Sequence, residues 1–385
     1  MEPETFRERL LSAAFGAGWN LVCRLPESVA RALFNFGADI AWRRQGPGVR
    51  VLEGNLVRVL RTDSAFSAAA AATAKAAAVP AGSLPDADGP ATGTANPGGP
   101  AADAAPPARP YVAADPGVPY PPVDGAELRK LSRAVLRSYA RYYLEAFRLQ
   151  VIPAERIADG MHVNKENVDL TLEYLKNGRG VIYALPHMGD FEQAGLWVMR
   201  YGAGSFTTVA ERLKPESVFQ KFLMFRQGLG MEVLPTTGGP HPFGVMAQRL
   251  RAGKLVCIVA DRDLSDTGVE VEFFGEKALF PAGPAALAVQ TGAALMPVSC
   301  WFVGDSEWAA HVHEEIPVPA AGTRKEKAAA MTQALATVFE KAILEHPEDW
   351  HMLQKLFVND LDPERRARIR GRATAGNGTG NGTGA

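Results

Sequence analysis

The sequence predicts an α/β protein, with a central mixed, mostly parallel sheet flanked by helices and an N-terminal helical arm. From Gly180 onward, short β-branched runs alternate with amphipathic helical patterns, which is typical of parallel strands joined by helices. Residues 1–61 show helical periodicity only, so we expect them to form an arm of two amphipathic helices. Together these two observations define the predicted fold class.

Composition divides the chain into four segments. Its 385 residues include 38 glycines and 28 prolines, more than a globular protein usually carries. Much of this excess lies in 62–125, which consists almost entirely of Ala, Pro, Gly, Asp, Ser and Thr and offers few side chains for a core. We therefore expect an N-terminal amphipathic helical arm at 1–61, a disordered insertion at 62–125, an α/β domain at 126–366 packed with the arm, and a disordered tail at 367–385.

The periodicities predict the elements of the α/β domain one by one. Apolar residues recur at three and four positions from Leu128 to Leu149, which indicates a first helix, and arginines lie four residues apart on its other face, at 129, 133, 137 and 141. This arginine stripe is either simply solvated or binds anionic lipid or cofactor phosphate. The expected strands are 181–185, 206–210, 231–234, 255–260 and 295–303. The expected helices are 190–200, 215–228, 242–252, 284–291 and 325–344.

Charge, cysteine content and hydropathy exclude several classes of protein. The formal net charge of -1 argues against a dedicated nucleic-acid binder. Three scattered cysteines predict neither a disulfide framework nor a zinc cluster, and we expect them to be reduced in a cytosol-facing protein. The acidic first residues do not resemble a secretory signal, and no uninterrupted apolar run is long enough to span a bilayer. The arm 1–61 carries a local excess of arginine, so we expect it to meet an anionic membrane.

The segment after the first predicted strand carries the strongest chemical signal. His187 lies in the joint between the strand and the next helix, where ligands bind in open α/β sheets, and Pro186 and Gly189 shape the turn around it. Glu192 lies five positions further on, close enough to reach back to the imidazole and raise its basicity. Such a pair makes a general base for a hydroxyl proton. The alternatives are a structural histidine, and a capping role for Asp190.

The spacing of His187 and Glu192 resembles the His-x4-Asp/Glu motif of glycerolipid and lipid A acyltransferases, and the wider pattern is similar to the bacterial lipid A lauroyl/myristoyl acyltransferase family. Within that family, residues 260–271 are most similar to the phosphatidylinositol mannoside acyltransferases. The resemblance covers nearly the whole chain apart from 62–125 and the tail. Its further segments are Asn55-Leu56, Pro186 to Glu192, Phe273-Phe274-Gly275, Pro281 to Ala285, Ala288 to Pro297 and Asp349-Trp350-His351.

This resemblance implies the transfer of a fatty acyl chain from acyl-CoA to a mannose hydroxyl of phosphatidylinositol mannoside. The enzyme would be peripheral, on the cytoplasmic face of the inner membrane, and would need no metal and no cofactor besides acyl-CoA as co-substrate. His187 would be the base, and Glu192 would complete the motif. A second acid near the Arg-Asp-Leu stretch serves the histidine in the mannoside enzymes, and that position is Asp261 here. Either carboxylate is therefore a candidate partner.

Acyl-CoA also requires cations for its phosphates, and the candidates include Arg212, Arg226 and Arg262. Arg212 is favoured because it follows a strand end on the expected side of the site, whereas Arg262 is flanked by two acids, and an ion pair with them is its alternative role. Further candidates are Lys214, Arg249, Arg251 and Lys254. The apolar face of 219–225 either lines an acyl groove or belongs to the core. Two alternative functions remain from the sequence: a lipid A-type or other glycolipid acyltransferase, and a peripheral lipid-binding protein without catalysis. A metal site at His311 and His313 is a weaker alternative, because no further ligand cluster accompanies them.

Overall fold

The computed structural model describes residues 5–77, 123–212, 215–238, 241–263, 265 and 267–377. Its α-helices are α1 (Phe6–Arg24), α2 (Glu27–Arg44), α3 (Pro47–Ala77), α4 (Gly125–Arg148), α5 (Ala154–Gly160), α6 (Lys165–Lys176), α7 (Phe191–Val198), α8 (Glu216–Gly228), α9 (Pro242–Arg251), α10 (Gly283–Thr291), α11 (Arg324–Glu345) and α12 (Pro363–Asn377). Three shorter helical segments are η1 (Met199–Ala203), η2 (Pro347–Asp349) and η3 (Val358–Asp360).

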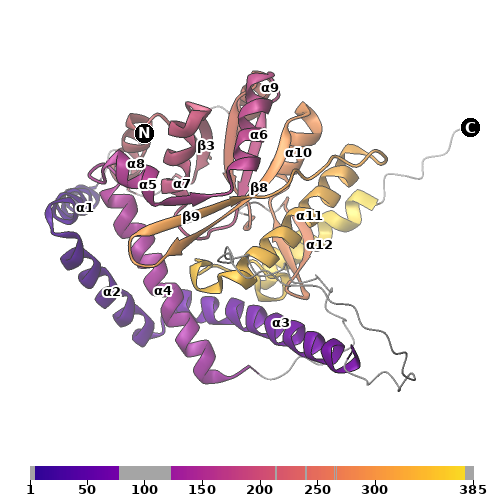
Figure 1. Ribbon diagram of the computed structural model, residues 1–385, viewed down its shortest axis with the longest axis horizontal. Coiled ribbons are helices and arrows are strands. Elements are labelled where there is room, and N and C mark those ends of the chain that lie inside the picture. Colours follow the sequence, from indigo (N-terminus) through magenta and orange to yellow (C-terminus); the bar gives the residue numbers. More distant parts are fainter. Residues whose placement is uncertain are drawn as a thin grey trace, which may run out of the picture.

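A seven-stranded sheet forms the centre of the molecule (Figure 1). Its strand order is β1-β9-β8-β2-β5-β3-β4, and β8, β2, β5, β3 and β4 run parallel. Strand β9 is antiparallel to β8, and β6 and β7 form a separate hairpin. This mixed, mostly parallel sheet with flanking helices confirms the predicted α/β class. The strands are β1 (Met161–Val163), β2 (Val181–Leu185), β3 (Phe206–Ala210), β4 (Glu232–Pro235), β5 (Leu255–Val259), β6 (Val269–Phe273), β7 (Glu276–Phe280), β8 (Ala294–Val303) and β9 (Glu307–Val312).

Helices cover both faces of the sheet, and the central strand β2 shows why. All five of its residues are buried, as expected for a strand packed on both sides. Ile182 and Ala184 join a core formed with α9, α10 and α11. Val181, Tyr183 and Leu185 point to the opposite face, where they pack with residues of α5, α6 and α7. The side-chain alternation of a single strand therefore separates the two cores.

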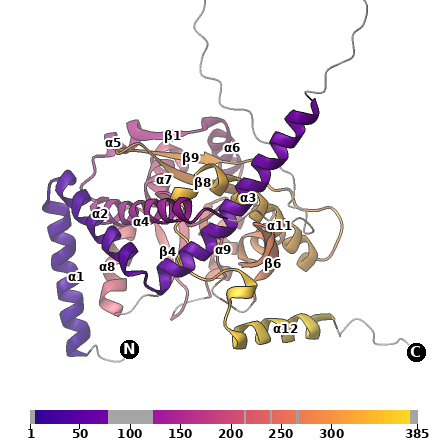
Figure 2. The same ribbon diagram turned by 90° about the horizontal axis from the view of Figure 1, so that it is seen from below.

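The N-terminal helices pack around α4 rather than against the sheet alone. Figure 2 shows α2 beside α4, with α1 at the left edge of the molecule and α3 running across it, and all three helices contact α4. Leu52 and Leu56 of α3 are fully buried in a small core that includes Val135 of α4. Helix α1 contributes an aromatic contact, in which the Trp19 and Phe222 ring centroids lie 5.0 Å apart. None of the helices in the described part of the chain has a stretch long and apolar enough to cross a bilayer.

The structure differs from the prediction at the segment boundaries. Helix α3 continues to Ala77, so the first part of the expected insertion, 62–77, is helical. This stretch is rich in alanine, the best helix former, and contains neither glycine nor proline. Helix α12 likewise extends into the expected tail as far as Asn377. The remaining parts of the predicted disorder, 78–122 and 378–385, lie outside the described residues.

Candidate active site

His187 and Asp261 meet because their strands are neighbours in the sheet. Strands β2 and β5 run parallel with Leu185 opposite Val259. Each strand is followed two residues later by one member of the pair, so both side chains emerge at the carboxyl edge of the sheet. His187 Nδ1 lies 2.5 Å from Asp261 Oδ1, and the His187 backbone N–H donates to Asp261 Oδ2 over 2.9 Å. The strand register therefore positions the pair directly.

The surroundings of Asp261 keep its carboxylate charged. Asp261 is fully buried, and Trp350 Nε1 donates to its Oδ2 over 3.0 Å. Burial alone would raise the Asp261 pKa, but the charge of His187 and the hydrogen bonds from His187 and Trp350 bring it below its ordinary value. A carboxylate only accepts hydrogen bonds, so Nδ1 of His187 donates and Nε2 remains available as a proton acceptor. The imidazole is one-third exposed, so a substrate hydroxyl can reach it.

A turn near the C-terminus holds the backbone around His187. The His351 N–H donates to the His187 carbonyl over 2.7 Å, and the Gly189 N–H donates to the Asp349 carbonyl over 2.9 Å. Gly189 has a φ of +58°, and a Cβ there would lie 2.4 Å from the backbone carbon of Cys300. Only glycine allows this close approach. The loop carrying His187 is therefore held between β8 and the turn at 349–351.

Helix α4 contributes a serine to the same assembly. The Ser138 hydroxyl donates to Asp349 Oδ1 over 2.5 Å and lies 2.8 Å from His351 Nε2. Burial, together with the charge of His187, lowers the His351 pKa to about 3, so this imidazole is neutral. Burial raises the pKa of Asp349 to about 6. The resemblance to the acyltransferase family included the segment Asp349-Trp350-His351. It did not predict that these residues would contact the loop that carries His187.

Glu192 does not contact His187, in contrast to one of the two expectations from the sequence. It lies in the first turn of α7, where its carboxylate is buried and forms an ion pair with Arg226 of α8. Asp190 caps the same helix, as the alternative interpretation proposed, by accepting from the Gln193 N–H over 3.0 Å. Glu192 is close to His187 in the sequence, but its side chain points toward helix α8. The structure therefore pairs His187 with Asp261.

A cavity of about 740 Å³ opens beside His187. Tyr139, Tyr143 and His351 line it near the imidazole. A second part of its lining is apolar and belongs to the core between the sheet and α7. The residues of this part include Val168, Leu185, Trp197, Val198, Phe206, Val298, Ala310 and Val312. The cavity thus has a largely apolar part and a polar part beside His187, which is typical of sites for ligands with an apolar body and a polar end.

The three candidate arginines have different positions. Arg262 lines the cavity, is 17% exposed and lies 3.5 Å from Glu211. Arg226 also lines the cavity, but Glu192 neutralises it. Arg212 is not among the lining residues, and its guanidinium binds Glu216 over 2.7 and 2.8 Å instead. Arg262 is therefore the candidate with most charge available to a ligand.

Residues 219–225, for which an acyl groove and a core face were the two interpretations, do not line this cavity. Phe222 and Phe225 pack against Trp19 of α1, with ring centroids 5.0 and 5.4 Å away. Their apolar face is covered by the N-terminal arm, as the core alternative for this segment proposed. His311 and His313 lie on β9 with ring centroids 4.5 Å apart. Within the described part of the chain, no group of three or more potential metal ligands gathers around them or elsewhere.

Comparison with known proteins assigns the chain to a class. Residues 121–359 match the family model described as bacterial lipid A biosynthesis acyltransferase. The chain therefore belongs to this family of acyltransferases. Its relatives include the phosphatidylinositol mannoside acyltransferase of Mycolicibacterium smegmatis, which is 40% identical over 356 residues, covering 92% of this chain and 94% of that protein. The phosphatidylinositol mannoside acyltransferase of Mycobacterium tuberculosis H37Rv is 39% identical over 360 residues, covering 93% and 92%.

Proposed function

We propose that this acyltransferase moves a fatty acyl chain from acyl-CoA to a mannose hydroxyl of phosphatidylinositol mannoside, with His187 as the general base. The observation that carries the proposal is the His187–Asp261 pair at the edge of a largely apolar cavity of about 740 Å³. The relatives named phosphatidylinositol mannoside acyltransferase align over nearly the whole chain, which supports phosphatidylinositol mannoside as the acceptor.

The geometry supports a direct transfer with one base. His187 Nε2 takes the proton of the mannose hydroxyl while the oxygen attacks the thioester carbonyl. The C–O bond forms, the carbonyl oxygen becomes an oxyanion, and collapse of this intermediate breaks the C–S bond. The leaving CoA thiolate then takes the proton from the imidazolium. Asp261 stabilises that imidazolium through its bond to Nδ1, so no covalent intermediate on the enzyme is required.

The cavity supports acyl-CoA as the donor. Its apolar part accommodates the acyl chain between the sheet and α7, which places the thioester beside the imidazole. Arg262 lines the polar part and provides a guanidinium for a CoA phosphate or for the developing oxyanion. Arg226 belongs to the wall, because its ion pair with Glu192 joins α7 to α8.

We place the enzyme on the cytoplasmic face of the inner membrane, and helix α2 supports attachment to a membrane surface. Val29, Leu33 and Phe36 follow one another at helical spacing on its outer side and are 44, 55 and 63% exposed. We call these three residues the α2 stripe. An exposed apolar stripe beside basic residues is typical of helices that lie in a membrane interface. A peripheral position brings the cavity close to a lipid-linked acceptor.

The test is acyl transfer by the purified chain, with palmitoyl-CoA and phosphatidylinositol mannoside in detergent. We expect an acylated glycolipid and free CoA from the wild type, and a loss of about a hundredfold or more in His187→Ala. Lipid A precursor offered in place of the mannoside should remain unacylated. If the wild type forms no product, or if His187→Ala retains the wild-type rate, the proposal is wrong.

A further inference from the structure

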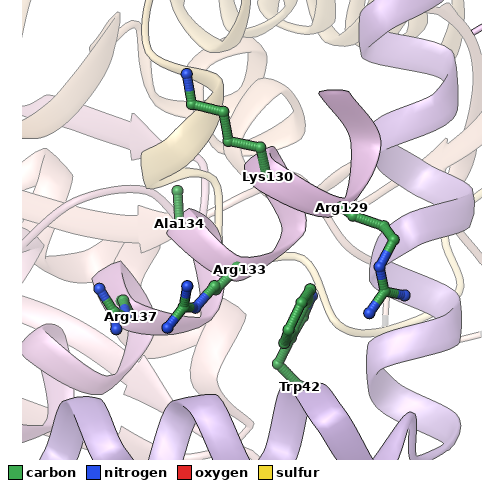
Figure 3. A pocket seen from close by; sticks show the side chains of 6 residues that line it. All are labelled: Trp42, Arg129, Lys130, Arg133, Ala134 and Arg137. Atoms are coloured by element: carbon green, nitrogen blue, oxygen red, sulfur yellow. The ribbon is translucent and has the colours of Figure 1, made fainter. Parts of the chain in front are cut away.

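A basic groove of about 410 Å³ lies between α2 and α4. Figure 3 shows Trp42 of α2 standing between the side chains of Arg129 and Arg133, with Lys130 extending away from them. Arg137 lies one turn further along α4. We call this the α2–α4 groove and define it by Trp42, Arg129, Lys130, Arg133 and Arg137.

Positive charge in the groove exceeds the nearby negative charge. Arg133 and Arg137 share a single carboxylate, Asp39, which both contact through two nitrogens at 2.6–2.9 Å. Glu53 lies behind the groove, where it accepts from Ser132 over 3.1 Å. Within the described residues, neither Arg129 nor Lys130 has an ion-pair partner. Four cations therefore face two carboxylates, which leaves an excess of positive charge for an anion.

The aromatic ring fixes the arginines in place. The Arg129 guanidinium lies 4.4 Å from the centroid of Trp42, and that of Arg133 lies 5.6 Å away. Trp42 is itself held by a hydrogen bond from its Nε1 to Ser132 Oγ over 3.0 Å. Asp39 occupies the Nε and Nη2 edge of Arg133, so in the described part of the chain it is Arg129 whose N–H edge faces no carboxylate. A guanidinium that lies over an aromatic ring binds phosphate through this edge in a bidentate manner. The arrangement is thus organised before any ligand arrives.

Two features favour a lipid over a soluble phosphate compound. The α2 stripe belongs to the same helix as Trp42 and Asp39, with Phe36 one turn before Asp39. A soluble ligand needs no exposed apolar side chains beside it, whereas a bilayer covers them. In addition, Tyr139 of the catalytic cavity lies only six residues beyond Arg133 on α4, about 9 Å along the helix. A lipid phosphate in the groove would therefore hold the membrane surface near the cavity.

We propose that the α2–α4 groove binds the phosphate of an anionic phospholipid while the α2 stripe contacts the acyl region of the same leaflet. This inference rests on the proposed attachment to a membrane and is separate from the acyl transfer. It assigns part of the α4 arginine stripe to a specific site rather than to a solvated surface.

The experiment is co-sedimentation of the purified full chain with vesicles of phosphatidylcholine, alone or mixed with phosphatidylglycerol. We expect binding to the mixed vesicles, and about fivefold weaker binding for each arginine lost in Arg129→Gln/Arg133→Gln. The matched control is Arg251→Gln/Lys254→Gln, which removes two exposed cations remote from the groove and should stay within twofold of wild type. Thermal unfolding of each variant verifies that it is folded.

A charge-conserving variant separates a built site from diffuse attraction. In Arg129→Lys/Arg133→Lys the net charge is kept, but bidentate binding and stacking on Trp42 are weakened, so we expect a severalfold loss. Wild-type binding by this variant, or equal losses in the groove variant and the remote control, would overturn the proposal. If inorganic phosphate, at a concentration equal to that of the phosphatidylglycerol, releases the wild type from the mixed vesicles, the groove binds a soluble ligand and the proposal is wrong. Acyl transfer by the wild type is measured in detergent, without vesicles. A failure of the proposed acyl transfer therefore shows in that assay, whereas a failure of the proposed lipid site shows in the vesicle binding of the variants relative to wild type.

Discussion

Asp261 holds His187 by two hydrogen bonds, one at 2.5 Å to the ring Nδ1 and one at 2.9 Å from the backbone N–H. The same carboxylate therefore determines both the position of the loop and the tautomer of the ring. Trp350 donates to Asp261 as well, so a segment close to the C-terminus supports a contact between two strand ends. Because Asp261 engages Nδ1, Nε2 is the ring nitrogen that remains available as a proton acceptor, and His187 lines the cavity.

Arg262 should matter for the donor substrate. Because Arg262 lines the cavity, Arg262→Gln should raise the KM for palmitoyl-CoA by about tenfold, the effect of losing one charge-assisted hydrogen bond. The measurement is steady-state kinetics over a range of donor concentrations. Arg212→Gln is the matched control, since Arg212 pairs with Glu216 outside the cavity lining. An equal rise in KM for both variants would exclude Arg262 as the specific ligand.

The apolar part of the cavity should set the length of the acyl chain. Ala310 is buried and lines this part from β9. Ala310→Leu fills space that the chain would occupy, so the ratio of kcat/KM for palmitoyl-CoA to that for lauroyl-CoA should fall below the wild-type ratio. Comparing two donors on one variant cancels any loss of folded protein, which overpacking by about 1–3 kcal/mol could cause. An unchanged ratio would place the acyl chain elsewhere.

Glu192 should contribute mainly to stability. Glu192→Gln leaves Arg226 without its buried partner, and we expect a loss of about 3 kcal/mol in the free energy of unfolding. Urea unfolding followed by circular dichroism measures this change. Glu216→Gln breaks the more exposed pair with Arg212 and should have a much smaller effect. If both variants lose the same unfolding free energy, burial does not make the Glu192–Arg226 pair more important for stability than the exposed pair.

His313 should give the fold an acid-sensitive component outside the site. Burial, with the charges of His311 and Lys341, lowers the His313 pKa from 6.5 to about 3. The unfolded chain then binds a proton that the folded chain does not, so stability is present above pH 6.5 and is lost as pH falls. Between pH 7 and pH 5 this loss should be about 2 kcal/mol. His313→Gln should reduce the difference in unfolding free energy between these two pH values by that amount; an unchanged difference would show that His313 is protonated in the folded state.

The sequence predicted the strand-to-helix frame well, because its central strands are apolar runs of limited length between turn residues. Strand 181–185 and helix 284–291 lie within one residue of their observed bounds. The hairpin of β6 and β7 was missed because the strand prediction relied on apolar runs, whereas β6 alternates apolar and acidic residues and β7 begins with Glu276 and Lys277. At the site, His187 could be found from its position at a strand end. Its partner could not, because the choice between Glu192 and Asp261 depends on the β2–β5 register and on Arg226 of a distant helix.

The central claim is that His187 acts as a base held by Asp261. The most direct test compares kcat for acyl transfer in Asp261→Asn and Glu192→Gln, each measured on protein shown to be folded. We predict a loss of about 10²–10⁴-fold for Asp261→Asn with little change in KM, because an asparagine no longer stabilises the imidazolium. Glu192→Gln should remain within about tenfold of wild type. The reverse order, with Glu192→Gln nearly inactive and Asp261→Asn close to wild type, would contradict the account.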